Sequence, residues 1–275
     1  MHASKPVALT IAGSDPSGGA GIQADLKTFH QFGVYGEAAV TLVTVQNTVA
    51  FERVEYLPAD LVAAQIGAVI ADIPPDAAKT GALGNQEIIE AVAELAPRFR
   101  FPLIVDPVFA SKHGGALLSS DAVAALKRLL PYAFLVTPNL EEAELLTGRE
   151  VSDAAGMKSA AEALLGLGAR AVLVKGGHLE GCPTDVLLHD GGFVEFPGER
   201  IRSRHTHGTG CTFSAAITAL LASGADLIAA IREAKQYVTE AIRTNPGLGA
   251  GSGPLNHHAE RPERRVQPAS ADRGE

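Results

Sequence analysis

The chain has 275 residues, of which 46% are hydrophobic, and this is enough for one large domain or two small ones with a packed core. A formal net charge of −8 argues against a broad surface for nucleic-acid phosphates, so we expect no nucleic-acid partner. Two cysteines are too few for a disulfide framework and no apolar run reaches membrane-spanning length, so we expect a soluble, cytoplasmic protein with no membrane partner.

The first predicted element is a buried strand over Val7–Ala12, followed by a glycine-rich loop and a helix over Ala20–Phe32. The loop reads GSDPSGGAG, which lacks the GxGxxG spacing of dinucleotide-binding turns and contains a proline. We interpret it as a substrate loop in which Gly13 allows a ligand to approach the backbone. Asp25 offers a carboxylate from the helix, although a solvated charge on the helix surface explains this residue better when it is taken alone.

A second strand over Glu37–Val45 ends in an amide pair, Gln46 and Asn47. Open α/β sheets bind ligands at the carboxyl ends of their strands, and an amide can read a heteroaromatic edge of mixed polarity. A turn stabilised by Asn47 is an equally good explanation. Val49–Tyr56 is predicted to form a short strand or flap, and Pro58–Ile70 an amphipathic helix.

Strands and helices then alternate along the chain. We predict strands at Ala77–Thr80, Pro102–Val105, Phe134–Val136 and Ala171–Val174, and helices at Asn85–Leu95, Asp121–Leu130 and Ser152–Gly166, the last capped by its serine. A β-hairpin over 186–196 and a final helix over Leu227–Arg243 follow. The alternation predicts an α/β fold with a mostly parallel sheet and helices on both faces.

Polar side chains follow three of these strands. Asp106 comes directly after one, Asn139 and Glu142 follow the next, and Lys175 ends a third. Asn139 and Glu142 have the spacing of a helix capping box, which explains either residue alone. Alternatively, they join Asp106 in organising a hydrated Mg²⁺ near nucleotide phosphates, with Lys175 placed to reach an anion.

The stretch His205–Ala216, HTHGTGCTFSAA, organises the rest of the prediction. Gly208, Thr209 and Gly210 precede Cys211, where an apolar helix begins. Such a turn leaves backbone N–H groups unpaired at the positive end of a helix dipole, which predicts a phosphate site and an acidic thiol. The turn could instead be only a tight connection, and Cys211 a small core residue.

Taken together and in order, several motifs resemble the hydroxymethylpyrimidine/phosphomethylpyrimidine kinases of thiamine biosynthesis, in the ribokinase-like superfamily. They are TIAGSDPSGGAGIQADLKTF, TVQNT, VDPV, TPNLEEAELLTG, VLVKGGH, HTHGTGCTFSAAI and GPLNH, and they span about residues 7–257. The resemblance implies a three-layer ribokinase-like kinase domain over 1–257 with a small β-flap, commonly a homodimer. We expect residues 258–275 to form a disordered tail. The implied reaction is ATP-dependent phosphorylation of 4-amino-5-hydroxymethyl-2-methylpyrimidine and then of its monophosphate.

The resemblance also implies roles for individual residues. The assigned positions are Gln46, Gly13, Asp25 and Lys235 for the pyrimidine substrate or its phosphate; Gly208, Thr209, Gly210 and Cys211 for the anion hole and base; Lys175, Asn139 and Thr137 for ATP; and Asp106 and Glu142 for Mg²⁺. Two residues depart from the family pattern, since Ala82 and Phe109 stand where methionine is common. Either change could shift the balance between pyrimidine and pyridoxal substrates.

Three alternative functions can be compared with the residues present in the chain. A pyridoxal/pyridoxine kinase of the same fold, or a bifunctional enzyme, acts on a similar hydroxymethyl heteroaromatic, and the motifs do not separate these from the pyrimidine kinases. A non-catalytic sensing domain should have lost Cys211, Asp106 or Lys175, and all three are present. A cysteine hydrolase is the weakest alternative because no Asn or Asp orienting group is evident beside the nearby histidines.

Overall fold

The computed structural model describes residues 5–109, 120–177 and 182–261, and within these ranges nine strands form one sheet in the order β3-β2-β1-β4-β5-β6-β7-β8-β9. The strands are β1 (Val7–Ser14), β2 (Tyr35–Gln46), β3 (Phe51–Tyr56), β4 (Ala77–Thr80), β5 (Leu103–Val105), β6 (Leu135–Val136), β7 (Ala171–Val174), β8 (Asp185–His189) and β9 (Gly192–Phe196). The central strands β2, β1, β4, β5, β6 and β7 pair with one another in parallel. At the two edges of the sheet, β3 pairs antiparallel with β2, and β8 and β9 continue antiparallel from β7. The expected mostly parallel sheet is confirmed.

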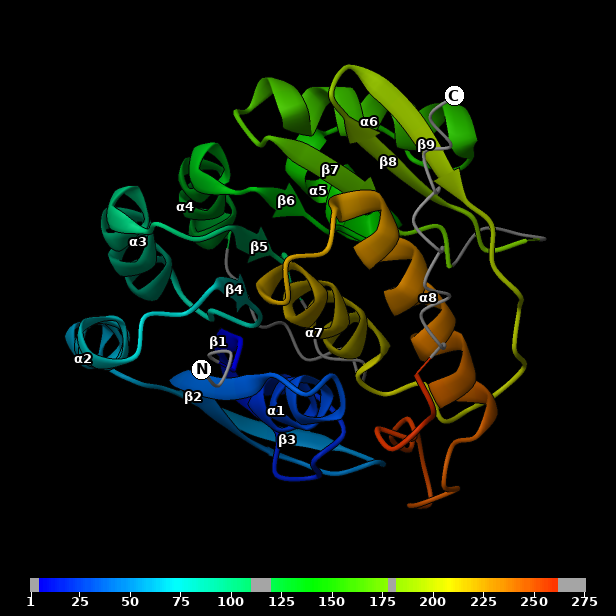
Figure 1. The fold of residues 1–275 in the computed structure, drawn as a ribbon, viewed down its shortest axis with the longest axis horizontal. Helices are drawn as coiled ribbons and strands as arrows, with labels where there is room; N and C mark the ends of the chain where they lie inside the picture. Colours follow the sequence, from blue (N-terminus) through cyan, green and yellow to red (C-terminus); the bar gives the residue numbers. More distant parts are fainter. Residues whose placement is uncertain (1–4, 110–119, 178–181, 262–275) are drawn as a thin grey trace, which may run out of the picture.

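Helices cover both faces of this sheet (Figure 1). They are α1 (Gly21–Gln31), α2 (Ala59–Asp72), α3 (Gln86–Leu95), α4 (Ser120–Leu129), α5 (Leu140–Thr147), α6 (Ala154–Gly166), α7 (Thr209–Ala222) and α8 (Leu227–Arg243). Helices α2 to α6 share one apolar core with the sheet, and α1, α7 and α8 share the other. The three-layer arrangement agrees with the ribokinase-like prediction.

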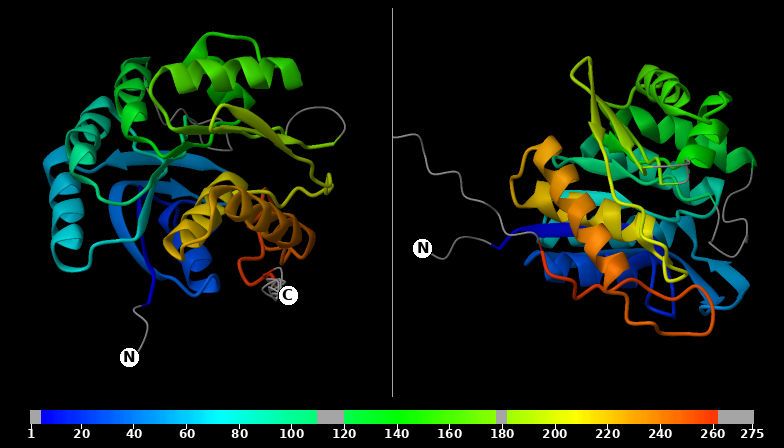
Figure 2. Two further views of the ribbon diagram at one scale, coloured as in Figure 1. Left: turned by 45° about the horizontal axis from the view of Figure 1, so that its top comes forward. Right: turned by 90° about the vertical axis from the view of Figure 1, so that its right-hand side faces the viewer.

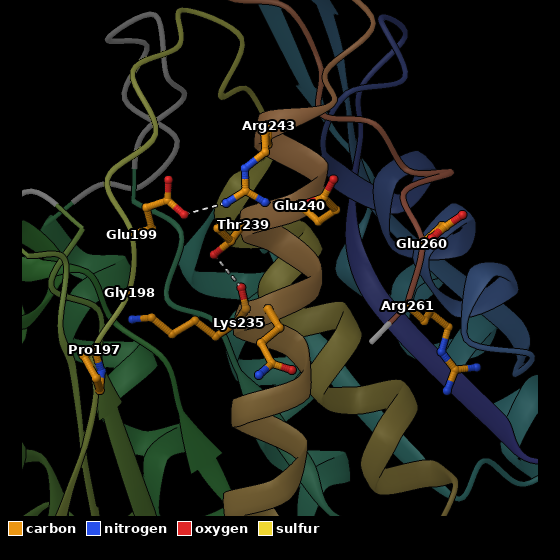
Figure 3. A pocket seen from close by; sticks show the side chains of 10 residues that line it. Pro197, Gly198, Glu199, Lys235, Thr239, Glu240, Arg243, Glu260 and Arg261 are labelled. Atoms are coloured by element: carbon orange, nitrogen blue, oxygen red, sulfur yellow. Dashed lines mark hydrogen bonds and ion pairs between the residues drawn. The ribbon is translucent and has the colours of Figure 1, made fainter. Parts of the chain in front are cut away.

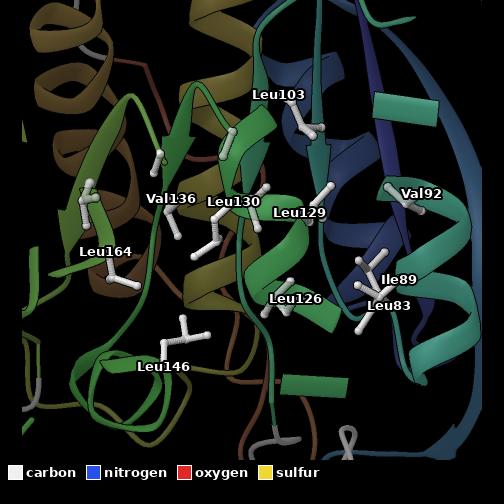
Figure 4. Packing of buried hydrophobic residues seen from close by; sticks show 14 of the residues in the cluster. Leu83, Ile89, Val92, Leu103, Leu126, Leu129, Leu130, Val136, Leu146 and Leu164 are labelled. Carbon is white, nitrogen blue, oxygen red and sulfur yellow. The ribbon is translucent and has the colours of Figure 1, made fainter. Parts of the chain in front are cut away.

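Alternation along the strands explains the two cores. In β5, Leu103 and Val105 point into the core of α2 to α6, part of which is drawn in Figure 4, whereas Ile104 points into the core of α1, α7 and α8. Successive side chains of a strand face opposite sides, so a strand covered on both faces is apolar throughout. Because all parallel strands run the same way, the polar residues that follow them gather at one edge.

Three local predictions need correction or completion. Asp153, and not Ser152, caps α6, since its side chain accepts a hydrogen bond from the Gly156 amide at 2.8 Å. Of the short strand or flap predicted over Val49–Tyr56, the strand alternative is correct: Phe51–Tyr56 forms the edge strand β3, which pairs with the end of β2. The sequence also predicts a glycine-containing loop over Phe109–Leu117, and most of it lies outside the described residues.

The chain continues in contact with the domain beyond the boundary predicted at residue 257. Ala259 is 3% exposed and accepts a hydrogen bond from Gln31 at 2.9 Å, and Arg261 donates to the carbonyl of Phe32 at 3.2 Å. Figure 2 shows this segment returning past α1 after α8. The residues from 258 to 261 are therefore ordered against α1, while the rest of the predicted tail lies outside the described residues.

Among the described residues, none of the helices is both long and apolar enough to cross a bilayer.

Candidate active site

A cavity of about 700 Å³ opens at the carboxyl ends of the parallel strands, between the β2–β3 hairpin and the start of α7. Most residues predicted for the site line it: Gly13, Gln46, Asp106, Asn139, Glu142, Lys175, Gly208, Thr209, Gly210 and Cys211. Ala82 and Phe109, the two departures from the family pattern, line it as well. Thr137, Asp25 and Lys235 do not.

The start of α7 has free backbone amides that face this cavity. Gly208 precedes the helix with φ of +81°, a conformation that favours glycine, and because glycine has no side chain it cannot cap the helix. Within the described residues, the amides of Gly210 and Cys211 have no hydrogen-bond acceptor, whereas Thr209 donates to the carbonyl of Thr206 at 3.3 Å. Two unpaired amides at the positive end of a helix make a binding site for an anion.

The glycine-rich loop is folded around the carboxylate of Asp15. This carboxylate accepts hydrogen bonds from the Ser17, Gly19 and Ala20 amides and from the Ser17 hydroxyl, at 2.8–3.2 Å. It also lies 2.8 Å from Nε2 of His207, the residue before Gly208. The loop and the start of α7 are thereby fixed to each other.

Cys211 lines the cavity and is partly exposed, but its thiol is not acidic. Burial raises the pKa of Cys211 to about 11, although the positive charge of Lys79 and a hydrogen bond from the Gly21 amide act in the opposite direction. Asp25 and Asp106 raise the pKa further. The predicted acidic thiol is therefore wrong, because burial and two carboxylates outweigh Lys79 and the Gly21 amide.

Asp106 and Lys175 form an ion pair at the base of the cavity, with 3.0 Å between Nζ and Oδ1. Thr137 and Ser214 also donate to the Asp106 carboxylate, each at 3.0 Å. Burial opposes ionisation of Asp106, but the charges of Lys175 and Lys79 outweigh it and hold its pKa below the ordinary value. Thr137 is fully buried, so its hydroxyl holds that carboxylate and does not reach the cavity.

Glu142 faces the same cavity from the first turn of α5. It forms a capping box with Asn139, in which each side chain accepts a hydrogen bond from the other residue's amide, at 2.7 and 2.9 Å. Its Oε2 lies 4.0 Å from Nζ of Lys175. Burial raises the pKa of Glu142 to about 7 despite that lysine, so a further cation would be favourable here. The capping interpretation of the sequence is confirmed, and it leaves this carboxyl group at the cavity wall.

Gln46 ends β2 at the opposite wall. Its Oε1 is buried and has no hydrogen-bond partner among the described residues. The neighbouring Asn47 has a structural task, because its side chain accepts hydrogen bonds from Val49 and Ala50 in the turn to β3. An unpaired buried amide oxygen is costly, and a ligand donor would satisfy it.

Asp25 is not a substrate contact. It is fully buried below the cavity, where Lys79 approaches both of its carboxylate oxygens at 2.9 Å and Thr10 donates at 2.7 Å. Cys211, which lines the cavity, lies within electrostatic reach of both members of this pair. The helix from Gly21 turns Asp25 inward, toward a lysine on β4 that the sequence analysis did not single out.

Lys235 also lies outside the cavity. On α8 it binds Oδ2 of Asp185 at 2.7 Å and the carbonyl of Pro183 at 2.8 Å. Figure 3 shows it beside Gly198, in a separate depression of about 420 Å³. Asp185 in turn accepts a hydrogen bond from the Gly176 amide at 2.9 Å, so Lys235 supports the segment after Lys175 without reaching the substrate space.

Sequence reasoning missed three charged or polar residues at the site: Asp15, Lys79 and His207. Asp15 could have been found because an aspartate that opens a glycine-rich loop commonly accepts the loop amides. His207 belongs to the central motif, but the sequence suggests a role for it only in the hydrolase alternative. The sequence singles out Lys79 only by its position inside an apolar strand, which is an unusual place for a charged residue.

The fold and the site define a phosphotransferase: a ribokinase-like sheet with an anion site at a helix start, a buried carboxylate and a lysine around one cavity. The phosphomethylpyrimidine kinase family model matches residues 15–256, and the chain belongs to this family. A hydroxymethylpyrimidine/phosphomethylpyrimidine kinase of Rhizobium meliloti is 50% identical over 256 residues, which are 91% of this chain and 96% of that protein.

Two further proteins are similar. The thiamine biosynthesis bifunctional protein ThiED of Geobacter sulfurreducens is 50% identical over 252 residues, which are 90% of this chain; the chain spans about half (51%) of that relative. The structure of a Bacillus subtilis pyridoxal kinase in complex with ADP aligns with a TM-score of 0.87 at 40% identity, covering 93% of this chain and 98% of that one.

Proposed function

We propose that this protein phosphorylates 4-amino-5-hydroxymethyl-2-methylpyrimidine with ATP, and then phosphorylates the resulting monophosphate. One observation carries the proposal: a single cavity joins an unpaired amide oxygen, on Gln46, to two unpaired helix amides, on Gly210 and Cys211. The first suits a heteroaromatic ring with N–H donors, and the second suits a phosphoryl group. A relative named for this activity is 50% identical over 256 residues.

The ring end of the substrate is assigned to Gln46. The 4-amino group of the pyrimidine can donate to its Oε1, which would satisfy the unpaired oxygen. Leu42 and Phe51 line the same wall and supply apolar surface for the ring. Gly13 lies against Leu42, where a Cβ atom would come within 2.4 Å of the leucine side chain, so glycine keeps this wall open.

The phosphoryl end is assigned to the start of α7. The amides of Gly210 and Cys211 stabilise charge on the transferred group, and Lys175 binds phosphate oxygens. The substrate hydroxyl oxygen forms a bond to the γ-phosphorus as the bond to ADP breaks, and Cys211 accepts the hydroxyl proton. General-base assistance contributes about 10²–10⁴-fold, so positioning and the anion site account for the larger share of the rate enhancement.

Mg²⁺ is assigned to the wall formed by Asp106 and Glu142. Glu142 is a buried carboxyl group, and among the described residues no cation lies closer to it than the 4.0 Å of Lys175, so these oxygens fit a hydrated divalent ion. Within the described ranges, no group of three His, Cys, Asp or Glu side chains could hold a metal ion, so phosphate oxygens and water would complete its shell. The ion would neutralise charge on the nucleotide phosphates, and Asn139 keeps Glu142 oriented through the capping box.

Pyridoxal phosphorylation is the second candidate function. The similarity to a pyridoxal kinase structure favours it, as does the cavity wall at Ala82 and Phe109, which differs from the common family pattern. Both substrates present a hydroxymethyl group on a heteroaromatic ring, so the same phosphoryl site would serve either one.

Paired turnover measurements test these proposals. ADP release is followed with the pyrimidine alcohol, with its monophosphate and with pyridoxal, each with and without Mg²⁺, alongside calorimetric binding of each alcohol. The proposal expects the highest kcat/KM with the pyrimidine alcohol and a requirement for Mg²⁺. A higher kcat/KM with pyridoxal would make pyridoxal phosphorylation the better-supported function, and no turnover with either substrate would overturn both proposals.

A homodimer and a cytoplasmic location, which the resemblance and the free thiols support, would be tested by sedimentation and by cell fractionation.

A further inference from the structure

A buried ion pair beneath the cavity has no part in the reaction as described so far. Lys79 and Asp25 both have fully buried side chains, and Nζ lies 2.9 Å from each carboxylate oxygen. Burying two charges costs several kcal/mol per ion, and a pair of apolar side chains is often at least as stable. A pair in this position therefore calls for a role besides stability.

The pair lies directly under the reacting groups. Thr10 and Lys79 are neighbours on β1 and β4, and Asp25 lies one turn into α1. A Cβ atom at Gly81, which lines the cavity, would lie only 3.6 Å from Nζ of Lys79. The ammonium group is thus separated from the cavity by little more than one layer of backbone.

The charges of this ion pair act electrostatically on the Cys211 thiol. Its sulfur accepts a hydrogen bond from the Gly21 amide at the start of α1, while Cys211 itself belongs to the start of α7, so two helix N-termini meet at the thiol. The charged groups that face it are Lys79 from β4, Asp25 from α1, Asp106 after β5 and Lys175 after β7. Of these, Lys79 and Lys175 favour a negative sulfur, and Lys79 contributes more.

We propose that Lys79 is a positioning residue for catalysis, held by Asp25 and Thr10 so that its ammonium group stabilises negative charge on the Cys211 sulfur. This inference rests on the proposed role of Cys211 as the base. In the reaction the hydroxyl proton passes to sulfur, and in the preceding ionisation the thiol proton leaves to solvent; Lys79 keeps its own proton throughout. Asp25, predicted from the sequence to bind substrate, instead fixes this lysine.

Alkylation of the thiol tests the proposal without nucleotide or substrate. The full chain carries two cysteines, so a Cys182→Ser background leaves Cys211 as the single thiol. The rate of alkylation by iodoacetamide from pH 6.5 to 10 then reports its thiolate fraction. Lys79→Met should slow alkylation at pH 8 at least tenfold, whereas Asp25→Asn, which removes an opposing negative charge, should accelerate it. Lys79→Arg should retain most of the wild-type rate.

Opposite changes in the alkylation rate of Lys79→Met and Asp25→Asn indicate an electrostatic role, since loosening the fold would change the rate in the same direction in both variants. Lys235→Met is the matched control, because it breaks another largely buried lysine–carboxylate pair, one that does not line the cavity, and should leave alkylation unchanged. If Lys79→Met fails to fold, the double variant Asp25→Asn/Lys79→Met leaves no unpaired buried charge and is compared with Asp25→Asn. Equal alkylation rates in that comparison, or equal shifts in both single variants, would overturn the proposal. Undiminished turnover by Cys211→Ala would instead contradict the base assignment alone.

Discussion

Nε2 of His207 lies 2.8 Å from Oδ2 of Asp15, although 192 positions separate the two residues in the chain. The contact joins the substrate loop to the start of α7. Gly19 packs on the histidine ring so closely that a Cβ atom there would come within 2.7 Å of its Cδ2. The two halves of the cavity, one for the ring and one for the phosphoryl group, are therefore held in a fixed relation before any substrate binds.

Asp15→Asn should loosen this relation. The variant replaces a carboxylate that accepts several hydrogen bonds by an amide, which leaves loop N–H groups unsatisfied at a cost of about 1–3 kcal/mol. We expect a lower free energy of unfolding in urea and a higher KM for the alcohol. Ser17→Ala is the control, since it removes only one donor to the same carboxylate. An Asp15→Asn protein with wild-type stability and KM would contradict this account.

The same carboxylate should contribute to acid sensitivity. Burial opposes ionisation of Asp15, but hydrogen bonds from His207 and Ser17 and the charge of His207 lower its pKa below 3.8. A group whose pKa is lower in the folded state stabilises the fold above its unfolded pKa, and this contribution is lost as the pH falls through the folded pKa. Asp15→Asn should therefore show a smaller loss of Tm than the wild type between pH 5 and pH 3. Parallel curves for the two proteins would exclude a contribution from Asp15.

Two glycines at the start of α7 should respond to alanine in different ways. At Gly208 the positive φ and a Cβ position only 1.8 Å from the Gly19 carbonyl oxygen make any side chain incompatible with the loop contact. Gly208→Ala should lose both stability, by more than the roughly 1–3 kcal/mol of backbone strain, and activity.

Gly210→Ala provides the comparison. A methyl group there would lie 3.5 Å from Nζ of Lys175, an ordinary contact, so the protein should fold and keep its Tm. It would still occupy space above the free amides, and kcat should fall at least tenfold. Thermal melting and turnover separate the two variants, and a Gly210→Ala protein with full kcat would place the phosphoryl group elsewhere.

Cys211 provides a prediction about pH. Burial raises its pKa to about 11, so the thiolate is the minor species at neutral pH. If the thiolate is the base, kcat/KM should rise about tenfold per pH unit between pH 7 and 9, because the ionised fraction rises by that factor. Cys211→Ala should lose about 10²–10⁴-fold in kcat, lack this rise and still bind the pyrimidine in calorimetry. A flat wild-type profile would remove Cys211 as the base.

The sequence predicted which strand ends would meet, because parallel strands bring their carboxyl ends to one edge whatever the details of packing. Gln46, Asp106, Glu142 and Lys175 converge for this reason. It could not predict on which side of a helix a lone carboxylate points: Asp25 turns inward only because Lys79, 54 positions away, is there to receive it. The prediction of an acidic Cys211 thiol was wrong for the same reason, since its pKa depends on burial and on charges from distant parts of the chain, such as Lys79 and Asp106.

The wall at Ala82 provides a final test, of specificity. Its carbonyl accepts a hydrogen bond from Thr41 at 2.6 Å, so the backbone is fixed and a longer side chain would extend into the cavity. Ala82→Met restores the residue common in the family and fills space that the more heavily substituted ring of pyridoxal would need. We expect kcat/KM for pyridoxal to fall more than that for the pyrimidine alcohol, by about tenfold for steric exclusion worth 1–2 kcal/mol. Phe109→Met, which removes bulk from the same cavity, is the opposing variant and should favour pyridoxal. Equal effects on both substrates in both variants would mean that this wall does not select between them.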